Sequence, residues 1–178
     1  MAIRLFNADD SQKVIALFTR VFSDSEGESE GALIGSLVAS LIESTSPNEL
    51  LGCVFETEEK IVGGIFFSRM RLSNKNTAYI LSPLAVSTEY QKTGLGQGLI
   101  RAGIEHLTNK DTDFLFTYGD PAYYSKTGFV SINEDQVKAP CELQYPEGWL
   151  VLPLGGELQL LKGVTSRCVA ALDRPDIW

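Results

Sequence analysis

The apolar residues in the first quarter of the chain follow two different periods. A short β-prone run, Ile3–Phe6, predicts a strand, and Asp9 or Asp10 after it is suited to cap a helix. Apolar residues then recur twice at helical spacing, which predicts two amphipathic helices. The positions that carry this pattern are Val14, Leu17, Phe18, Val21 and Phe22, and then Leu33, Ile34, Leu37, Val38 and Leu41. Between the helices, Ser23–Glu30 is acidic and has few apolar groups, so we expect a loop there.

The pattern changes to extended runs after residue 50. Leu51–Glu56 and Ile61–Arg71 are predicted to form a hairpin that turns at Thr57–Lys60. The pair Gly63-Gly64 inside the second run indicates a bulge or a close approach of the backbone. Thr77–Val86 is expected to be a third strand of this group.

The second half of the chain returns to mixed elements. Leu95–Asn109 is predicted to be a helix, Phe114–Tyr118 a buried strand, and Pro121–Lys126 a short helix before a strand at Gly128–Val130. Beyond residue 139 the pattern weakens, with candidate strands at Glu142–Tyr145, Leu150–Leu152 and Glu157–Lys162 and an irregular tail at Arg174–Trp178. No repeat or linker divides the chain, so we expect one α/β domain over residues 1–178.

Composition narrows the class of protein. Hydrophobic residues make up 44% of the chain and charged residues 21%, which is typical of a globular protein. No apolar run approaches the roughly 18 residues that span a membrane, and the N-terminus lacks an apolar signal core. We therefore expect a soluble, cytoplasmic protein without a membrane partner. The 15 basic and 23 acidic residues, a net charge of −8, disfavour nucleic acid as a partner.

Cysteine and histidine give no sign of a metal centre. Cys53, Cys141 and Cys168 are far apart, form no CxxC pair and are odd in number, so we interpret them as small buried thiols. His106 is the single histidine, and we expect it on the surface of its helix. We predict no metal site.

The candidate chemistry lies where the strand Thr77–Val86 runs through a polar turn into the helix that begins at Leu95. The first amides of a helix have no partner within the helix, and the helix dipole adds partial positive charge there. Gly94 and Gly96 allow the backbone to approach a ligand without a Cβ in the way. This arrangement predicts a phosphate site that needs no basic patch.

The spacing of the glycines separates the known phosphate loops. The P-loop pattern GxxxxGK[ST] is absent, and the third glycine of a dinucleotide fingerprint is misplaced because Gln97-Gly98-Leu99 follows Gly96. The pattern [QR]xxGxG does fit, as Gln91-Lys92-Thr93-Gly94-Leu95-Gly96. This segment resembles the pyrophosphate loop of the GNAT acyltransferase family. Downstream, Asp120–Phe129 resembles the YxxxGF helix end of the same family.

The order of the predicted elements also matches that family over residues 1–132, whereas residues 139–178 match loosely. The resemblance is closest to an uncharacterised bacterial branch with a GDPxYYxxxGF-like segment. It implies an α/β fold of the α+β sandwich type, with a mixed, mostly antiparallel sheet, helices on both faces and a splayed central strand pair. Pro83 suits a bulged, splayed strand because it cannot donate to a sheet ladder.

The resemblance implies acetyl-CoA as co-substrate, with its thioester between Leu84–Val86 and Phe114–Tyr118. The residues expected to bind it are Leu84, Ala85, Val86, Gln91, Lys92, Thr93, Gly94, Leu95, Gly96 and Gln97. It also implies direct attack by a neutral amine, with a backbone N–H of the Leu84–Val86 stretch holding the oxyanion.

The same resemblance places the general acid at Tyr124, four residues before Gly128, with Tyr123 as the rival. The general base stays open among Glu56, Asp120 and a water chain. A thiol relay through Cys53 is a weaker option.

The expected function is N-acetyl transfer from acetyl-CoA to a primary amine, carried by a small molecule or a protein. A non-catalytic acyl-CoA-binding sensor or interaction module is the alternative. The acidic side chains of Ser23–Glu30 could attract a cationic amine, although a solvated loop is the favoured interpretation. The identity of the acceptor and the oligomeric state, with a homodimer as one option, are left open.

Overall fold

The computed structural model describes residues 2–58 and 60–178, which group into two compact units. The first contains the chain up to Phe67 together with Pro83–Gly103. The second contains Ser68–Ser82 and Ile104–Trp178. No helix among the described residues is both long enough and apolar enough to cross a membrane.

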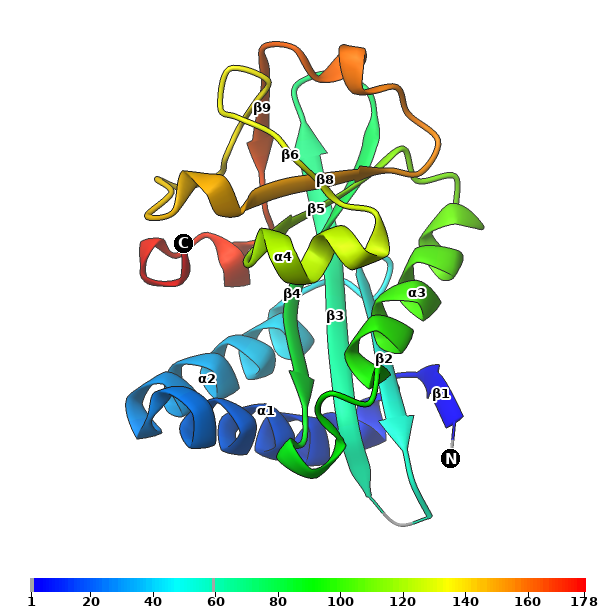
Figure 1. The fold of residues 1–178 in the computed structure, drawn as a ribbon, viewed down its shortest axis with the longest axis vertical. Coiled ribbons are helices and arrows are strands. Elements are labelled where there is room, and N and C mark those ends of the chain that lie inside the picture. Colours follow the sequence, from blue (N-terminus) through cyan, green and yellow to red (C-terminus); the bar gives the residue numbers. More distant parts are fainter. Residues whose placement is uncertain (1, 59) are drawn as a thin grey trace. The chain divides into compact units, whose positions relative to one another are not determined.

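The first unit combines one end of a sheet with three helices (Figure 1). Its sheet has the order β1-β2-β3-β4, and β1 runs antiparallel to β2 with Ala2 opposite Glu56. Its elements are β1 (Ala2–Leu5), η1 (Ala8–Asp10), α1 (Ser11–Glu26), α2 (Glu28–Ser44), β2 (Leu50–Glu56), the first part of β3 (Ile61–Leu72), the last part of β4 (Thr77–Val86), η2 (Thr88–Tyr90) and most of α3 (Leu95–Thr108). The predicted hairpin is confirmed, because Thr57 donates to the Lys60 carbonyl at 2.9 Å.

Two adjacent glycines in β3 show that helices cover both faces of this sheet. A methyl group at Gly63 would come within 3.0 Å of Leu99 of α3, whereas one at Gly64 would come within 3.0 Å of Phe18 of α1. Successive residues of a strand point to opposite faces. Helices α1 and α3 therefore lie against opposite faces of β3, and the close approach predicted for this glycine pair is confirmed.

The segment between the first two helices differs from the prediction. Helix α1 continues to Glu26 and α2 begins at Glu28, so the expected loop Ser23–Glu30 is reduced to Gly27, whose φ is +103°. Side chains at Gly31 and Gly35 would overlap Ser23 and Thr19 of α1. The sequence looked like a loop because the exposed ends of both helices are polar, while glycines supply the close packing of α2 on α1 (Figure 1).

A charged cluster ties β1 to the start of α1. Arg4 donates to both carboxylate oxygens of Asp10 at 2.7 and 2.9 Å and to Glu56 at 2.8 Å. Asp10 is only 5% exposed and also accepts from the Asn7 amide at 3.0 Å. The Arg4 guanidinium lowers the pKa of Asp10 below its ordinary value.

The second unit is built on a sheet with the order β3-β4-β5-β8-β6. Strand β5 (Phe114–Tyr118) runs parallel to β4 and antiparallel to β8 (Trp149–Pro153), whose far side pairs with β6 (Val130–Ser131). Strand β9 (Val164–Arg167) pairs with β3 and with β7 (Val137–Lys138). The unit also holds α4 (Pro121–Tyr124), η3 (Ser125–Thr127), η4 (Pro146–Gly148), η5 (Leu158–Leu161), η6 (Ala170–Leu172) and η7 (Pro175–Ile177). The predicted mixed, mostly antiparallel sheet is confirmed.

An aromatic core explains why the end of the chain is ordered. Trp149 stacks on Phe116 at 5.3 Å, and Trp178 lies edge-on to Trp149 at 6.0 Å and stacked on Tyr118 at 5.8 Å. The indole N–H of Trp178 donates to the Leu172 carbonyl at 2.8 Å. The tail predicted to be irregular instead forms the turn η7 and buries its last residue.

Only one of the three candidate strands beyond residue 139 is a strand. Leu150–Leu152 lies within β8, whereas Glu142–Tyr145 is irregular and Leu158–Leu161 is a 3-10 turn. The short strands β7 and β9 were not predicted. Two to four residues are too few to show a period, and their pairing depends on partners that are distant in sequence.

We predict that Asp10→Asn lowers the free energy of unfolding by about 1–3 kcal/mol at pH 7, because Arg4 would keep a buried partner without charge. Urea denaturation measures this loss. Folding lowers the pKa of Asp10, so its carboxylate stabilises the folded state above the unfolded pKa. This stabilisation is lost as the pH falls below about 4, where the free energies of unfolding of the two proteins should converge. Asp9→Asn, at an exposed carboxylate, is the control and should change little. Equal losses in both variants would contradict the role of Asp10.

Candidate functional site

The turn after β4 has a backbone that directs its amides outward. Lys92 has a φ of +61° and Gly94 a φ of +88°, and α3 begins at the next residue, Leu95. Two side chains stabilise the turn. The side-chain amide of Gln91 donates to the Val86 carbonyl at 3.0 Å, and the Thr93 hydroxyl donates to the Tyr90 carbonyl at 2.6 Å. The predicted strand–turn–helix is confirmed as a structure.

Six consecutive amides of this turn are free. Gln91 N–H donates to Thr88 and Gly98 N–H donates to Gly94, but the N–H groups of residues 92 to 97 have no acceptor among the described residues. Unpaired amides at the start of a 14-residue helix form an anion site, because they combine donors with the positive end of the dipole. The residues that line it are Lys92, Thr93, Gly94, Leu95, Gly96 and Gln97.

Strand β4 continues beyond its ladder with β5. The parallel register pairs Ala78 with Phe114 and ends with Leu81 opposite Thr117, whereas β4 itself runs on to Val86. Pro83 follows the end of the ladder and has no N–H to donate. The ladder with β5 thus stops before Leu84–Val86.

In the second unit, a capped turn holds the two candidate tyrosines. The Asp120 carboxylate accepts from the Ala122 amide at 2.8 Å, Pro121 occupies the first helical position, and Gly128 ends the turn with a φ of +97°. The Tyr124 ring lies edge-on to Tyr123 at 5.2 Å and to Phe129 at 5.6 Å. A side chain at Gly119 would come within 2.7 Å of the Tyr124 ring, so glycine is needed there.

The hydroxyl of Tyr124 is part of a chain of polar groups. Burial raises the pKa of Tyr124 to about 12, and a hydrogen bond with the Thr117 hydroxyl opposes that shift. Thr117 is fully buried and donates to the Leu81 carbonyl at 3.1 Å, at the point where the β4–β5 ladder ends. Burial also raises the pKa of Tyr123. Both phenols are therefore protonated at neutral pH, as a proton donor must be.

Thr117 is a polar contact of Tyr124 that the sequence did not reveal. It lies inside a buried strand, seven positions before Tyr124, where a threonine is indistinguishable from an ordinary strand residue. The hint that was available is that Thr117 is the one hydroxyl in the apolar run Phe114–Tyr118 apart from the terminal tyrosine.

The remaining candidates have structural partners. Glu56 is ion-paired with Arg4, which lowers its pKa, and Asp120 caps α4. Cys53 is buried in β2 and burial raises its pKa to about 11, so it is not a thiolate at neutral pH. His106 is exposed on α3. Among residues 2–58 and 60–178, no group of three or more His, Cys, Asp or Glu side chains is placed to hold a metal ion.

Residues 12–129 match the model of the acetyltransferase (GNAT) family. The chain belongs to this family. The matched segment includes both the free amides of residues 92–97 and the turn that carries Tyr124. Among curated proteins, an uncharacterised N-acetyltransferase of Escherichia coli, YjhQ, is 32% identical over 127 residues, which are 68% of this chain and 70% of YjhQ.

Solved structures give the same family from the fold. The GNAT N-acetyltransferase YhbS of Escherichia coli in complex with CoA has a TM-score of 0.82 and 25% identity, covering 97% of this chain and 92% of that protein. A GNAT acetyltransferase of Brucella melitensis in complex with acetyl-CoA has a TM-score of 0.65 and 23% identity, covering 88% and 89%. The likeness to YhbS extends through the C-terminal region that the sequence pattern matched loosely, so this region too belongs to the GNAT fold.

Proposed function

We propose that this GNAT protein transfers an acetyl group from acetyl-CoA to a primary amine by direct attack. The observation that carries the proposal is the run of six unpaired amides at residues 92–97, which suits the pyrophosphate of CoA. The complexes of YhbS with CoA and of the Brucella protein with acetyl-CoA support the same choice of co-substrate.

In the proposed reaction, the amine nitrogen attacks the thioester carbonyl and a tetrahedral oxyanion forms. A backbone N–H of Leu84–Val86 stabilises that oxyanion, because this stretch has left the ladder with β5. When the carbon–sulfur bond breaks, Tyr124 donates its proton to the CoA thiolate, and the extra proton of the amide product restores the Tyr124 phenol by way of water. We assign no general base, since Glu56 and Asp120 already serve other partners.

Tyr124 is the preferred acid and Tyr123 the rival. The Tyr124 ring packs against Tyr123, Phe129 and Gly119, which holds its phenol in one place and favours proton transfer to a fixed atom. The alternative function, an acyl-CoA-binding module without transferase activity, has no need of such a donor. The acceptor amine belongs to a small molecule or a protein, and the acidic ends of α1 and α2 are the segment that would favour a cationic one.

We predict that Gly94→Ala weakens CoA binding about 10-fold, because a side chain in the left-handed region costs about 1–2 kcal/mol and distorts the turn. Calorimetric titration with CoA measures the effect. Gly163→Ala is a matched control, since Gly163 has a φ of +72° and, like Gly94, open space around it. It should lose similar stability and keep CoA affinity. If CoA binds neither wild type nor variant, and does not raise the melting temperature, the co-substrate assignment is wrong.

We expect Tyr124→Phe to lower kcat about 100-fold or more while leaving the Kd of acetyl-CoA within about twofold, because the ring packing survives and only the proton donor is lost. A thiol-release assay with a panel of primary amines gives kcat. Tyr123→Phe is the matched control and should retain most activity. A large loss in Tyr123→Phe with none in Tyr124→Phe would transfer the acid role to Tyr123, and a wild type that binds acetyl-CoA but acetylates no amine would support the binding module.

The pH dependence offers a separate check. With its pKa raised to about 12, Tyr124 stays protonated across the usual assay range, so kcat should not fall between about pH 7 and 10 through loss of the acid. It should instead rise or level off as the acceptor amine deprotonates. A descending limb near pH 9 that disappears in Tyr124→Phe would contradict the raised pKa.

A further inference from the structure

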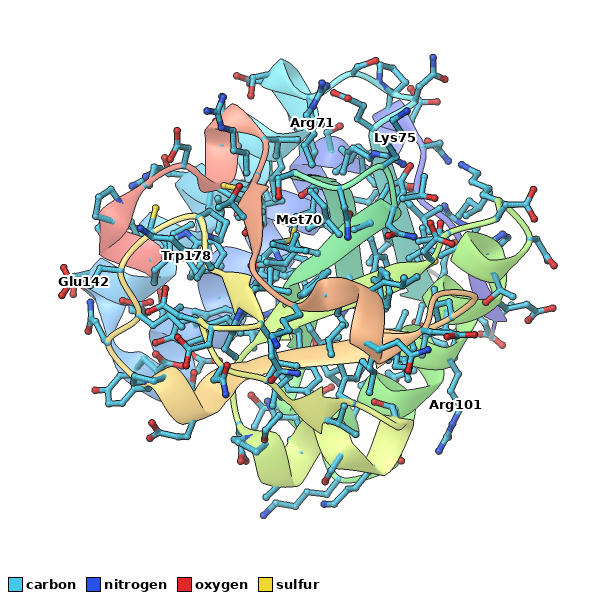
Figure 2. The ribbon with its side chains drawn as sticks, turned by 90° about the horizontal axis from the view of Figure 1, so that it is seen from above. Met70, Arg71, Lys75, Arg101, Glu142 and Trp178 are labelled. Atoms are coloured by element: carbon cyan, nitrogen blue, oxygen red, sulfur yellow. The ribbon has the colours of Figure 1, made fainter. Side chains whose placement is uncertain are left out.

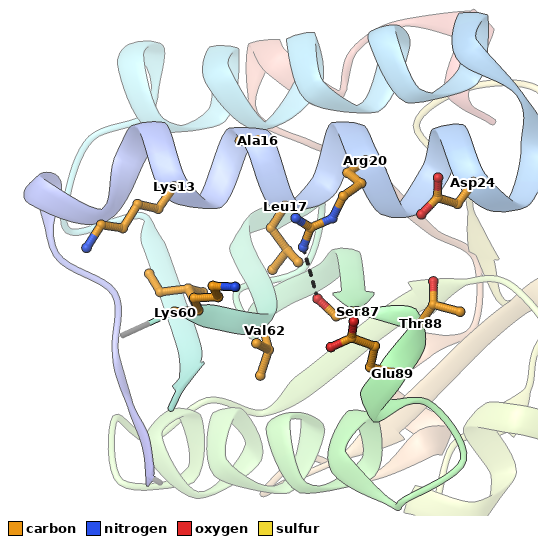
Figure 3. Close-up of a pocket in the computed structure, with 11 residues that line it drawn as sticks. Lys13, Ala16, Leu17, Arg20, Asp24, Lys60, Val62, Ser87, Thr88 and Glu89 are labelled. Atoms are coloured by element: carbon orange, nitrogen blue, oxygen red, sulfur yellow. Dashed lines mark hydrogen bonds between the residues drawn. The ribbon is translucent and has the colours of Figure 1, made fainter. Parts of the chain in front are cut away.

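The first unit contains a polar pocket that lies outside the turn proposed to hold CoA. The pocket has a volume of about 530 Å³ and lies between α1, the start of β3 and the end of β4 (Figure 3). None of the residues that line it belongs to the turn at 91–97. Its polar and charged lining residues are Lys13, Arg20, Asp24, Lys60, Ser87, Thr88 and Glu89.

Three cations gather here in a protein whose net charge is −8. Lys13 and Arg20 extend from α1, and Lys60, the residue before β3, lies on the other side of the pocket (Figure 3). Among the described residues, none of the three forms an ion pair. The three cations outnumber the two carboxylates of the lining, and such a local excess of positive charge attracts an anion.

Ser87 adds a buried donor to the same place. Its side chain accepts from the Arg20 guanidinium at 3.2 Å, and the residue is only 7% exposed. Because Ser87 is the acceptor in this bond, its own hydroxyl proton can be donated to a ligand in the pocket. A guanidinium fork beside a hydroxyl and an ammonium is a donor set that suits phosphate oxygens.

The two carboxylates of the pocket restrict what the rest of the ligand can be. Lys13, Arg20 and Asp24 follow one face of α1, and Asp24 lies about 16 Å along the axis from Lys13, at 1.5 Å per residue. Figure 3 shows Glu89 next to Ser87 and Asp24 at the end of the pocket away from Lys13. These acceptors favour a ligand with amino or hydroxyl donors and disfavour an extended polyanion.

We infer that this pocket binds a small phosphate-bearing metabolite that also carries an amino or hydroxyl group. The phosphate lies among Lys13, Arg20, Lys60 and Ser87, and the donor group faces Glu89 and Asp24. This site is separate from the CoA turn and does not depend on the proposed transferase activity.

The test is a calorimetric titration of the full chain with O-phosphoethanolamine in the presence of saturating CoA, so that the amides of residues 92–97 are occupied. We expect a Kd in the millimolar range or tighter, and weakening of about 10-fold or more in Arg20→Gln/Lys60→Gln, because two charged donors are lost. Arg101→Gln is the matched control: Arg101 is an exposed cation of α3 that points outward (Figure 2), and its loss should change the Kd less than twofold.

Ethanolamine serves as the second probe and should bind at least 10-fold more weakly than its phosphate ester, because the cations recognise the phosphate. Equal affinity for the two probes would overturn the inference, and so would unchanged affinity in the double variant. The inference also fails if no heat of binding is measured at about 10 mM O-phosphoethanolamine, a concentration about tenfold above the expected Kd. The CoA affinity of each variant reports correct folding. If CoA itself fails to bind, the proposed function fails, while the titration without CoA still decides whether this pocket is a phosphate site.

Discussion

The end of the β4–β5 ladder is the constraint on which the rest of the candidate site depends. A strand inside a sheet normally satisfies its backbone on both edges, and an unpaired edge attracts another strand or a ligand. Here the ladder stops with Leu81 opposite Thr117, and β4 continues past Pro83 without that partner. At this point the Thr117 hydroxyl donates a hydrogen bond to the Leu81 carbonyl, so a side chain satisfies the acceptor where the ladder ends.

The same hydroxyl also opposes the rise that burial causes in the pKa of Tyr124. Thr117 thereby links the end of the ladder to the phenol that we propose as the acid. The turn that carries Tyr124 is fixed independently, by the Asp120 cap at its start and by Gly128 in the left-handed region at its end. The Tyr124 ring also packs against Tyr123, Phe129 and Gly119, and a phenol held in one place loses little entropy when it donates a proton.

The sequence was most informative where a function is encoded locally. The turn at 91–97 was predictable because its conformation needs glycine at 94 and its chemistry comes from backbone amides next to a helix start, which are adjacent in the chain. Strands such as Thr77–Val86 and Phe114–Tyr118 were predicted with the bounds that the structure has. The reverse holds for Ser23–Glu30, where polar helix ends resembled a loop, and for β9, whose pairing with β3 and β7 no local pattern records.

Contacts between residues that are far apart in the sequence could not be predicted from local patterns. Arg20 and Ser87 are 67 positions apart and meet only because α1 lies against the face of β3 next to the end of β4. Read along the chain, Lys13, Arg20 and Lys60 are ordinary surface cations in an acidic protein. In the folded chain, however, all three line one pocket together with the Ser87 hydroxyl. The two proposed anion sites therefore differ physically: one would use free amides at a helix start, which tolerate a negative net charge, and the other a local cluster of cations, which offsets it.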